Sequence, residues 1–411
     1  SINAPPTEDV YYLYVIDAVG NVSAQSIAAV TVDNTPPAVV LSDDQSDAFV
    51  RDADTVTITA TFTEADQIDE VSGAPTIQIG GLINSVMTKQ NNLVWTYIWD
   101  VPAGNDGIQA VTISATDRAG NTNTPATGRT SYTIDNIAPT DANVVMNVPA
   151  MTMGGATLTI TPSSDPNDTL WLAPIGTTVF ATGPTMTFTD GAATSIIVPA
   201  SEGMYYLYVI DQAGNISLPS SNGVSVDNTA PTEQDSILTA SVFVQSNTDV
   251  SISNGESGSF SLAPLGTTNF TPSETVTTTD AANTTITSPA LEGEYHLYVM
   301  DMVGNVSAPS TAVVTVDDTP PTNQDTVLAA SVSVKSSVAV AITSSGDAGN
   351  NVWLAPSGTV NFFLATDMTK AAGTSTSITA PGIEGVYYIY IIDAAGNVSS
   401  PSTAYVTVDN T

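Results

Sequence analysis

The stretch Tyr205-Tyr-Leu-Tyr-Val-Ile-Asp-Gln-Ala-Gly-Asn215 decides the fold, because it joins a run of aromatic and aliphatic residues to a tight turn. Aromatic and β-branched residues favour strands. In Asp-X-X-Gly, the aspartate suits the first turn position, and the glycine suits a backbone with positive φ. The stretch therefore predicts a β-hairpin that turns at Asp211.

The same motif recurs along the chain, and a second motif follows it each time. Asp-X-X-Gly-Asn begins at Asp17, Asp117, Asp211, Asp301 and Asp393, at intervals of 100, 94, 90 and 92 residues. The second motif, VDNTPP or a close variant, begins at Val32, Ile134, Val226, Val316 and Val408. Two motifs in a fixed order define structural repeats. They predict a partial repeat at 1–35 and complete repeats at 36–137, 138–229, 230–319 and 320–411.

Each repeat has the composition of a β-sandwich. Its segments are short, rich in Val, Ile, Thr and Tyr, and bounded by Gly, Pro, Asn and Asp, without helical periodicity. This pattern predicts an all-β protein with about seven strands per repeat. In the second repeat we expect a strand at 55–62, and Val111, Ile113 and Ala115 should face the core. Strands of about 8 to 10 residues at about 3.3 Å each make a sandwich about 30 Å long, so four in tandem predict an extended rod of well over 100 Å.

The charge balance excludes several functions. The chain has six Lys and Arg and 41 Asp and Glu, which gives a formal net charge of −35 at pH 7. Such a surface repels phosphate backbones and anionic lipids, so we expect no nucleic-acid partner. Apolar runs are shorter than the roughly 18 residues of a spanning helix, so we expect no membrane insertion in this segment. The absence of Cys excludes disulfides and thiolate metal sites.

Catalysis is also disfavoured. A glycosidase needs a unique pair of acids, whereas the acids here recur at equivalent loops of every repeat. His296, the single histidine, aligns with Tyr206 and Tyr388 and is therefore interpreted as a substituted strand aromatic. The sequence predicts that the chain is not an enzyme.

The strings YYLYVIDAVGNVS at 11–23 and VTVDNTPP at 30–37 resemble the tandem bacterial immunoglobulin-like repeats of large secreted adhesins and surface stalk proteins. VTITATFTEA at 56–65 is similar to one subtype, and the shared (W/S)LAP-X-G-T of the last three repeats is similar to another. The resemblance implies tandem immunoglobulin-like β-sandwiches in an extracellular or cell-surface adhesin stalk or filament. It implies as partners other copies of the same chain, or cell-surface or glycan targets.

The acidic loops predict calcium at the repeat junctions. In an immunoglobulin-like sandwich the B–C and F–G loops lie beside the preceding linker, so carboxylates from two repeats should converge there. Oxygen donors without His or Cys suit Ca²⁺, and the junctions resemble those of cadherins, whose linkers also carry Asp-Asn followed by Pro. The alternative is that Asp in Asp-X-X-Gly caps its own turn. The candidate ligands are Glu8, Asp33, Asn34, Asp117, Asp135, Asn136, Asp165, Asp168, Glu202, Asp211, Asp227, Asn228, Glu256, Glu292, Asp301, Asp317, Asp318, Asp347 and Asp393.

A set of aromatic residues is expected on the outer face of the sheet that contains strands C and F. Alternation along these strands points one set toward the core and the other outward, and Ser261 replaces the tryptophan in the repeat 230–319. The outward set could form an interaction surface, which makes a carbohydrate-binding module the alternative function. Alternatively, the long segment after LAP-X-G-T folds over this face and buries it. The outward residues are Trp171, Tyr206, Tyr208, Tyr298, Trp353, Tyr388 and Tyr390.

Overall fold

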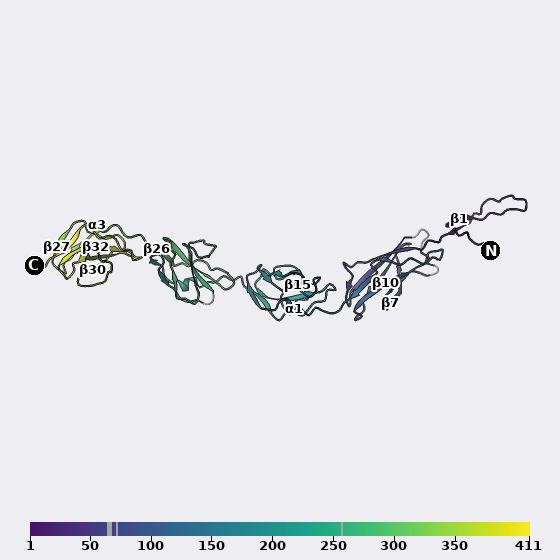
Figure 1. Cartoon of the computed structure of the whole chain (residues 1–411), viewed down its shortest axis with the longest axis horizontal. Coiled ribbons are helices and arrows are strands. Elements are labelled where there is room, and N and C mark those ends of the chain that lie inside the picture. Colours follow the sequence, from purple (N-terminus) through teal and green to yellow (C-terminus); the bar gives the residue numbers. More distant parts are fainter. Residues whose placement is uncertain (64–67, 71–72, 256–257) are drawn as a thin grey trace. The chain divides into compact units, whose positions relative to one another are not determined.

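The computed structural model describes residues 1–63, 68–70, 73–255 and 258–411. Each sheet lies inside one of the predicted repeats, as the labelled strands in Figure 1 illustrate. Three helices of four residues are the remaining regular elements in the described ranges. The all-β prediction is therefore confirmed. By their contacts the residues form two units, 1–150 with 154–226 and 151–153 with 227–411.

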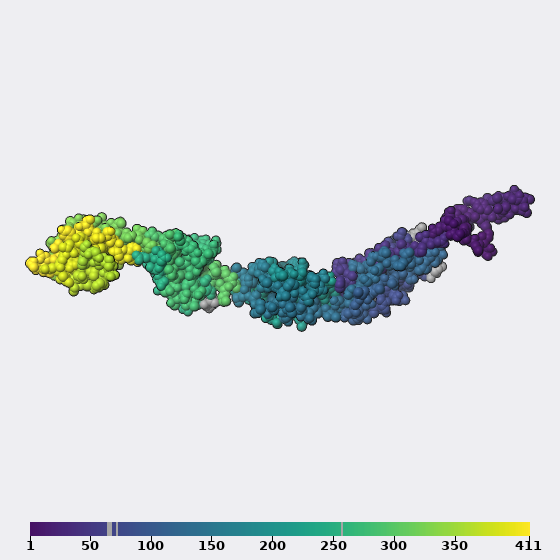
Figure 2. All heavy atoms as spheres, in the orientation of Figure 1, coloured from purple at the N-terminus to yellow at the C-terminus, as the bar shows by residue number. Residues whose placement is uncertain are grey.

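The partial repeat 1–35 is a two-stranded antiparallel hairpin of β1 (Asp9–Tyr12) and β2 (Ala29–Val32). Figure 2 shows this segment, in dark purple, as a thin body without a second layer. Leu13 and Val15 are 56% and 65% exposed, whereas Leu207 and Val209 at the same motif positions are 0% exposed. A two-stranded ribbon has no second sheet against which to bury such residues.

The repeat 36–137 contains two five-stranded sheets, ordered β4-β12-β10-β6-β7 and β11-β3-β5-β9-β8. Its strands are β3 (Ala38–Ser42), β4 (Phe49–Val50), β5 (Thr55–Thr63), β6 (Thr76–Ile79), β7 (Ile83–Val86), β8 (Thr88–Lys89), β9 (Val94–Asp100), β10 (Gly107–Ser114), β11 (Thr127–Gly128) and β12 (Ser131–Ile134).

The core of this repeat lies between the two sheets. The predicted strand at 55–62 is β5, and its alternate residues Val56, Ile58, Ala60 and Phe62 are buried. Val111, Ile113 and Ala115 are also buried, as predicted. Strand alternation in the sequence thus identified the core-facing side correctly.

The last three repeats share a second topology of seven strands each in the described ranges. The five-stranded sheets of the fourth and fifth repeats have the orders β20-β26-β25-β22-β23 and β27-β33-β32-β29-β30. In the third repeat, strands β19-β18-β15-β16 follow the same order. The pairs β14-β17, β21-β24 and β28-β31 form the opposing sheets. These three repeats match the prediction of about seven strands, whereas the repeat 36–137 has ten in the described ranges.

The bounds of these elements are as follows. The third repeat contains α1 (Ala142–Val145), β13 (Ala150–Thr152), β14 (Thr157–Thr159), β15 (Thr169–Ala173), β16 (Thr187–Asp190), β17 (Ser195–Ile197), β18 (Gly203–Ile210) and β19 (Gly223–Val226). The fourth contains α2 (Gln234–Ile237), β20 (Val242–Val244), β21 (Asp249–Ser251), β22 (Ser259–Ala263), β23 (Thr277–Asp280), β24 (Thr285–Thr287), β25 (Gly293–Met300) and β26 (Val313–Val316). The fifth contains α3 (Gln324–Val327), β27 (Val332–Val334), β28 (Ala339–Ala341), β29 (Asn351–Pro356), β30 (Thr369–Ala372), β31 (Ser377–Thr379), β32 (Gly385–Ile392) and β33 (Tyr405–Val408).

The register confirms how the repeats align. His296 lies opposite Ala263, Tyr206 opposite Ala173 and Tyr388 opposite Ala355. His296 is therefore a strand residue at the tyrosine position, as predicted, and its Nδ1 lies 2.7 Å from the carbonyl oxygen of Ser310. No helix among the described residues is long and apolar enough to cross a membrane.

Candidate functional site: the repeat junctions

The Asp-X-X-Gly-Asn motif forms a tight turn between the last two strands of each repeat. In the third repeat the carboxylate of Asp211 accepts hydrogen bonds from the backbone N and the side-chain Nδ2 of Asn215, at 2.8 and 2.9 Å. Gly214 has φ +83°, which is a left-handed conformation that favours glycine. The aspartate thus caps its own turn and fixes the asparagine side chain at the same time.

The second amide hydrogen of this asparagine reaches the preceding linker. An amide Nδ2 carries two hydrogens, and the one not held by aspartate is donated to a backbone carbonyl oxygen of the linker. The same bond occurs for Asn121 to Asp33 (3.1 Å), Asn215 to Asp135 (2.9 Å), Asn305 to Asp227 (3.0 Å) and Asn397 to Asp317 (2.7 Å). We call each set of turn aspartate, turn asparagine and linker carbonyl a junction clasp.

The linker is also held by an acid from the repeat that it leaves. In the first junction Glu8 Oε1 accepts hydrogen bonds from Asn34 N and Thr35 Oγ1, at 2.8 and 2.6 Å. The hydrogen bonds from Thr35 and then Asn34 lower the pKa of Glu8. The linker is therefore hydrogen-bonded by groups from both sides. Equivalent bonds run to Glu292 from Asp318 and Thr319, to Glu384 from Asn410, and to Asp106 from Asn136.

Further contacts join the clasp to neighbouring turns. Within the first unit Arg51 Nη1 donates to the carbonyl oxygen of Gly214. Within the second unit Gln245 Nε2 donates to Asn397 Oδ1 at 2.7 Å. Each contact brings a turn of one repeat against the Asp-X-X-Gly-Asn turn of the next repeat in its unit.

Most of the predicted junction residues therefore lie close together in the structure. They are joined by hydrogen bonds in which N–H groups donate to the acids and the linker carbonyls. Glu8, Asp33, Asn34 and Asp117 belong to one hydrogen-bonded junction with Asn121. The other three junctions contain the following predicted residues: Asp135, Asn136 and Asp211; Asp227 and Asp301; and Glu292, Asp317, Asp318 and Asp393. Glu202 and Asn228 also have interaction partners. Glu256 lies outside the described residues.

The acids predicted in the B–C loops, which precede β15 and β29, accept hydrogen bonds within those loops. Asp165 Oδ1 accepts the N–H of Asn167 at 2.9 Å, and Asp347 Oδ1 accepts that of Gly349 at 2.8 Å. Asp168 is buried, and Ser163 Oγ donates to its Oδ2 at 2.5 Å. Burial raises the pKa of Asp168; the Ser163 bond opposes this, and the charges of Asp165, Asp141 and Asp211 add to it. Thr169, at the start of β15, pairs with Ile210, at the end of β18, so the B–C and F–G loops lie at one pole.

The junction acids of the described residues accept hydrogen bonds from N–H groups of their own turns and linkers. Both carboxylate oxygens of Asp211 already accept N–H bonds from Asn215. Within the described ranges, no group of three or more Asp, Glu, His or Cys is placed to hold a metal ion. The hydrogen-bonded turn, which the sequence left as the alternative, is the arrangement found, and calcium stays a prediction.

The predicted interaction surface needs correction. Its residues lie on the outer face of the C and F strands, as expected, but Tyr208, Tyr298, Trp353 and Tyr390 are only 3%, 4%, 6% and 3% exposed. The segment after LAP-X-G-T covers them, because Phe180 packs on Trp171 and Tyr208 with ring centroids 5.4 and 5.2 Å apart. Trp171, Tyr206 and Tyr388 are half-buried. This face is a second core, which we call the outer aromatic cluster.

The cluster also explains the LAP-X-G-T motif. Tyr208 Oη accepts the N–H of Gly176 at 3.0 Å and donates to the carbonyl oxygen of Pro174 at 3.2 Å. Tyr298 and Tyr390 make the same pair of bonds to their own motifs. The motif is thus a turn that a buried tyrosine fastens to the sheet.

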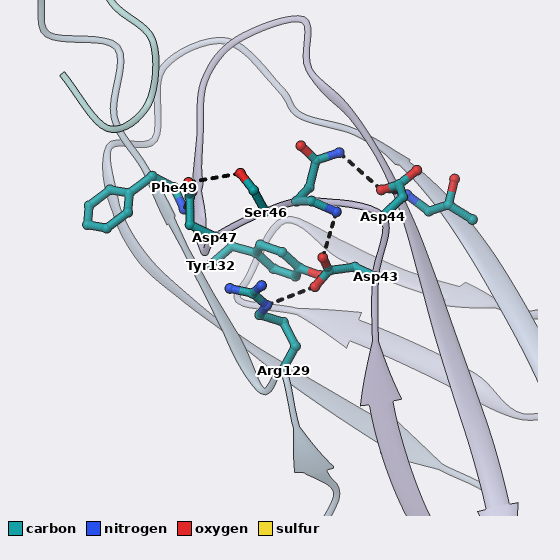
Figure 3. A network of polar contacts seen from close by, with 9 residues as sticks. Asp43, Asp44, Ser46, Asp47, Phe49, Arg129 and Tyr132 are labelled. Atoms are coloured by element: carbon teal, nitrogen blue, oxygen red, sulfur yellow. Dashed lines mark hydrogen bonds and ion pairs between the residues drawn. The ribbon is translucent and has the colours of Figure 1, made fainter. Parts of the chain in front are cut away.

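One buried polar network was not foreseen. In the repeat 36–137 Asp43 Oδ2 accepts Tyr132 Oη at 2.8 Å and forms an ion pair with Arg129 Nε at 2.9 Å (Figure 3). The Asp43 side chain is 2% exposed, and burial followed by the Asp43 hydrogen bond raises the pKa of Tyr132. The network ties the loop after β3 to β12. No motif marks it, because its members are far apart in the sequence.

Comparisons with known proteins agree with a modular chain. No family model matches it. Over 250 residues, 56% of the chain, it is 31% identical to exoglucanase B of Cellulomonas fimi, and the match covers 22% of that protein. The chain therefore spans about a fifth of the length of this relative.

Among solved structures, the Clostridium thermocellum CbhA fibronectin(III)-like modules match with 13% identity and a TM-score of 0.29, over 46% of this chain and 94% of that one. The chicken CNTN1 FN1-FN3 domains match with 15% identity and a TM-score of 0.28, over 69% and 99%. Strand order defines the class: the chain consists of tandem immunoglobulin-like or fibronectin III-like β-sandwiches.

Proposed function

We propose that this chain is a structural spacer in a long extracellular or cell-surface bacterial protein, such as an adhesin stalk or filament. The observation that carries this proposal is the junction clasp, repeated at Asp33, Asp135, Asp227 and Asp317. A spacer needs the same joint at each step, whereas a catalytic centre would occupy one repeat.

The hydrogen bonds supply the physical basis for a stiff spacer. A linker held from both sides has fewer accessible backbone conformations than a free one. Each net hydrogen bond contributes about 1 kcal/mol, so two or three per junction bias it toward one geometry.

X-ray scattering from the full chain tests the spacer. A maximum dimension well above ~100 Å is expected from four sandwiches in tandem. A particle with the dimension of a compact globule would contradict the proposal. Imaging of the native material would then distinguish a single thread from a filament of associated copies.

The second candidate is that this chain belongs to a secreted carbohydrate-active enzyme, in which the repeats would connect other modules. The 31% identity with part of exoglucanase B favours it. In both candidates the repeats act as spacers. In the second case, the full-length protein would contain a separate catalytic module, which sequencing of the whole gene would reveal.

Calcium at the junctions remains a finer proposal. Its support is the clustering of acids along each linker and the charge of −35. Glycan binding by the outer aromatic cluster is less well supported, since four of the seven predicted residues are buried there.

A further inference from the structure

The outer aromatic cluster is incomplete in one repeat. In the third repeat Trp171 stacks on Phe188 at 4.9 Å, and in the fifth Trp353 lies under Lys370 Nζ at 5.6 Å. In the fourth repeat the matching cross-strand pair is Ser261 and Thr278. A tryptophan and its cross-strand partner are thus both replaced by small polar residues at one place.

A hollow of about 390 Å³ lies there. Its wall includes Ser259, Ser261, Phe270, Asp280, Asn283 and Met300. This volume is within the roughly 300 to 1,000 Å³ typical of small-molecule sites. The hollow occupies the outer face of β22 and β23, opposite the main core.

Ser261 is an unusual residue in this wall. It is 2% exposed, and among the described residues its Oγ has no hydrogen-bond partner. A buried hydroxyl without a partner is unfavourable, because it has lost its hydrogen bonds to water. Serine at this position leaves open the space that the tryptophan indole fills in the third and fifth repeats.

The chemistry of the wall selects the ligand class. Phe270 and Met300 offer apolar surface, while Asp280 and Asn283 offer acceptors and donors. The repeat 230–319 contains no Lys or Arg, so an anion would meet uncompensated negative charge. A purely apolar ligand would leave the polar wall groups unpaired.

We propose that this hollow binds one ring of a neutral saccharide, with a C–H face against Phe270 and hydroxyl groups toward Asp280 and Asn283. The proposal is independent of the spacer function, because it concerns one repeat and no junction. It also differs from the predicted aromatic surface, since it arises where the tryptophan is missing.

Calorimetric titration of the full chain with cellobiose, maltose and lactose tests the site. Binding of at least one sugar is expected, and Ser261→Trp should weaken it at least tenfold by refilling the hollow. Asp280→Asn should weaken it similarly without filling space, which keeps the test valid if the tryptophan variant fails to fold. Asp190→Asn is the matched control, because Asp190 holds the equivalent position opposite Thr169 beside a filled cluster.

Several results would overturn the proposal. They are absence of binding to all three sugars, unchanged binding in both Ser261→Trp and Asp280→Asn, or equal loss in Asp190→Asn. Preferential binding of N-acetyltryptophanamide, or self-association abolished by Ser261→Trp, would identify the hollow as a receptor for an aromatic side chain and would also refute the saccharide.

Discussion

The side-chain amide of Asn215 donates a hydrogen bond to the backbone carbonyl oxygen of Asp135, 80 residues earlier in the chain, at 2.9 Å. The same amide is held by Asp211 at 2.9 Å. The turn therefore acts locally as a cap and at long range as a clasp on the linker. The asparagine makes both kinds of bond in the four copies at Asp117, Asp211, Asp301 and Asp393, and Asn21 of the first copy bonds Asp17.

Asn215→Ala should loosen the junction between the repeats 36–137 and 138–229. Loss of a hydrogen bond worth about 1 kcal/mol predicts roughly fivefold faster limited proteolysis in the linker at 135–140. Because the chain has no Cys, spin labels at Thr112→Cys and Ser195→Cys would also report a broader distance distribution. Gln212→Ala, an exposed change in the same turn, should leave both readouts unchanged.

Acid should release the clasp of Asp301. Partial burial acts to raise the pKa of Asp301, but hydrogen bonds from Asn305, Gly304 and Val303 outweigh it, so its pKa lies below the ordinary 3.8. A lowered folded-state pKa means that the stabilisation is present above pH 3.8 and is lost as the pH falls through the folded value. The Asn305 side-chain amide signals in NMR should therefore hold until below pH 3.8; a midpoint above 3.8 would contradict the assignment.

Asp43→Ala should destabilise the repeat 36–137 by about 3 kcal/mol, since it leaves Arg129 and the Tyr132 hydroxyl without their buried partner. Hydrogen exchange of peptides from this repeat would measure the loss. Asp52→Ala, at an exposed residue of the same repeat, is the control. Equal exchange in the two variants would mean that the network contributes little.

Trp353→Ser should destabilise the last repeat by about 3 kcal/mol, because Trp353 is 6% exposed and packs against Phe362 and Tyr390. An interaction surface would instead tolerate the change. Val386→Ser, at a side chain 46% exposed, is the control. Urea unfolding monitored by hydrogen exchange of residues 320–411 separates the two cases.

Calcium chelation should leave the junctions unchanged if the hydrogen bonds act alone, because these bonds need no metal. Limited proteolysis with EDTA and with added CaCl₂ compares the two states, and MgCl₂ controls for ionic strength. Protection by calcium alone, accompanied by calorimetric binding, would instead support the sequence-based calcium prediction.

Sequence by itself determined the two repeated motifs, the β-class of the fold and the core-facing side of the strands that alternate clearly, such as β5 and β10. These features depend on local properties: the period of two that buries Val111 and Ile113, and the turn chemistry of Asp211 and Gly214. It also located Asp211 beside Asp135, because strand order places the F–G turn next to the preceding linker.

Tertiary structure alone decided how those groups are used. Periodicity assigns Tyr208 to the outer face but cannot show that Phe180 covers it, since the covering loop has no regular period. The number of acids at the junctions suggested a metal from the sequence. Only the structure showed that the side-chain amide of Asn215 donates to the carboxylate of Asp211. The Asp43, Arg129 and Tyr132 network, and the hollow beside Ser261, depend on packing between distant segments, which residue spacing does not encode.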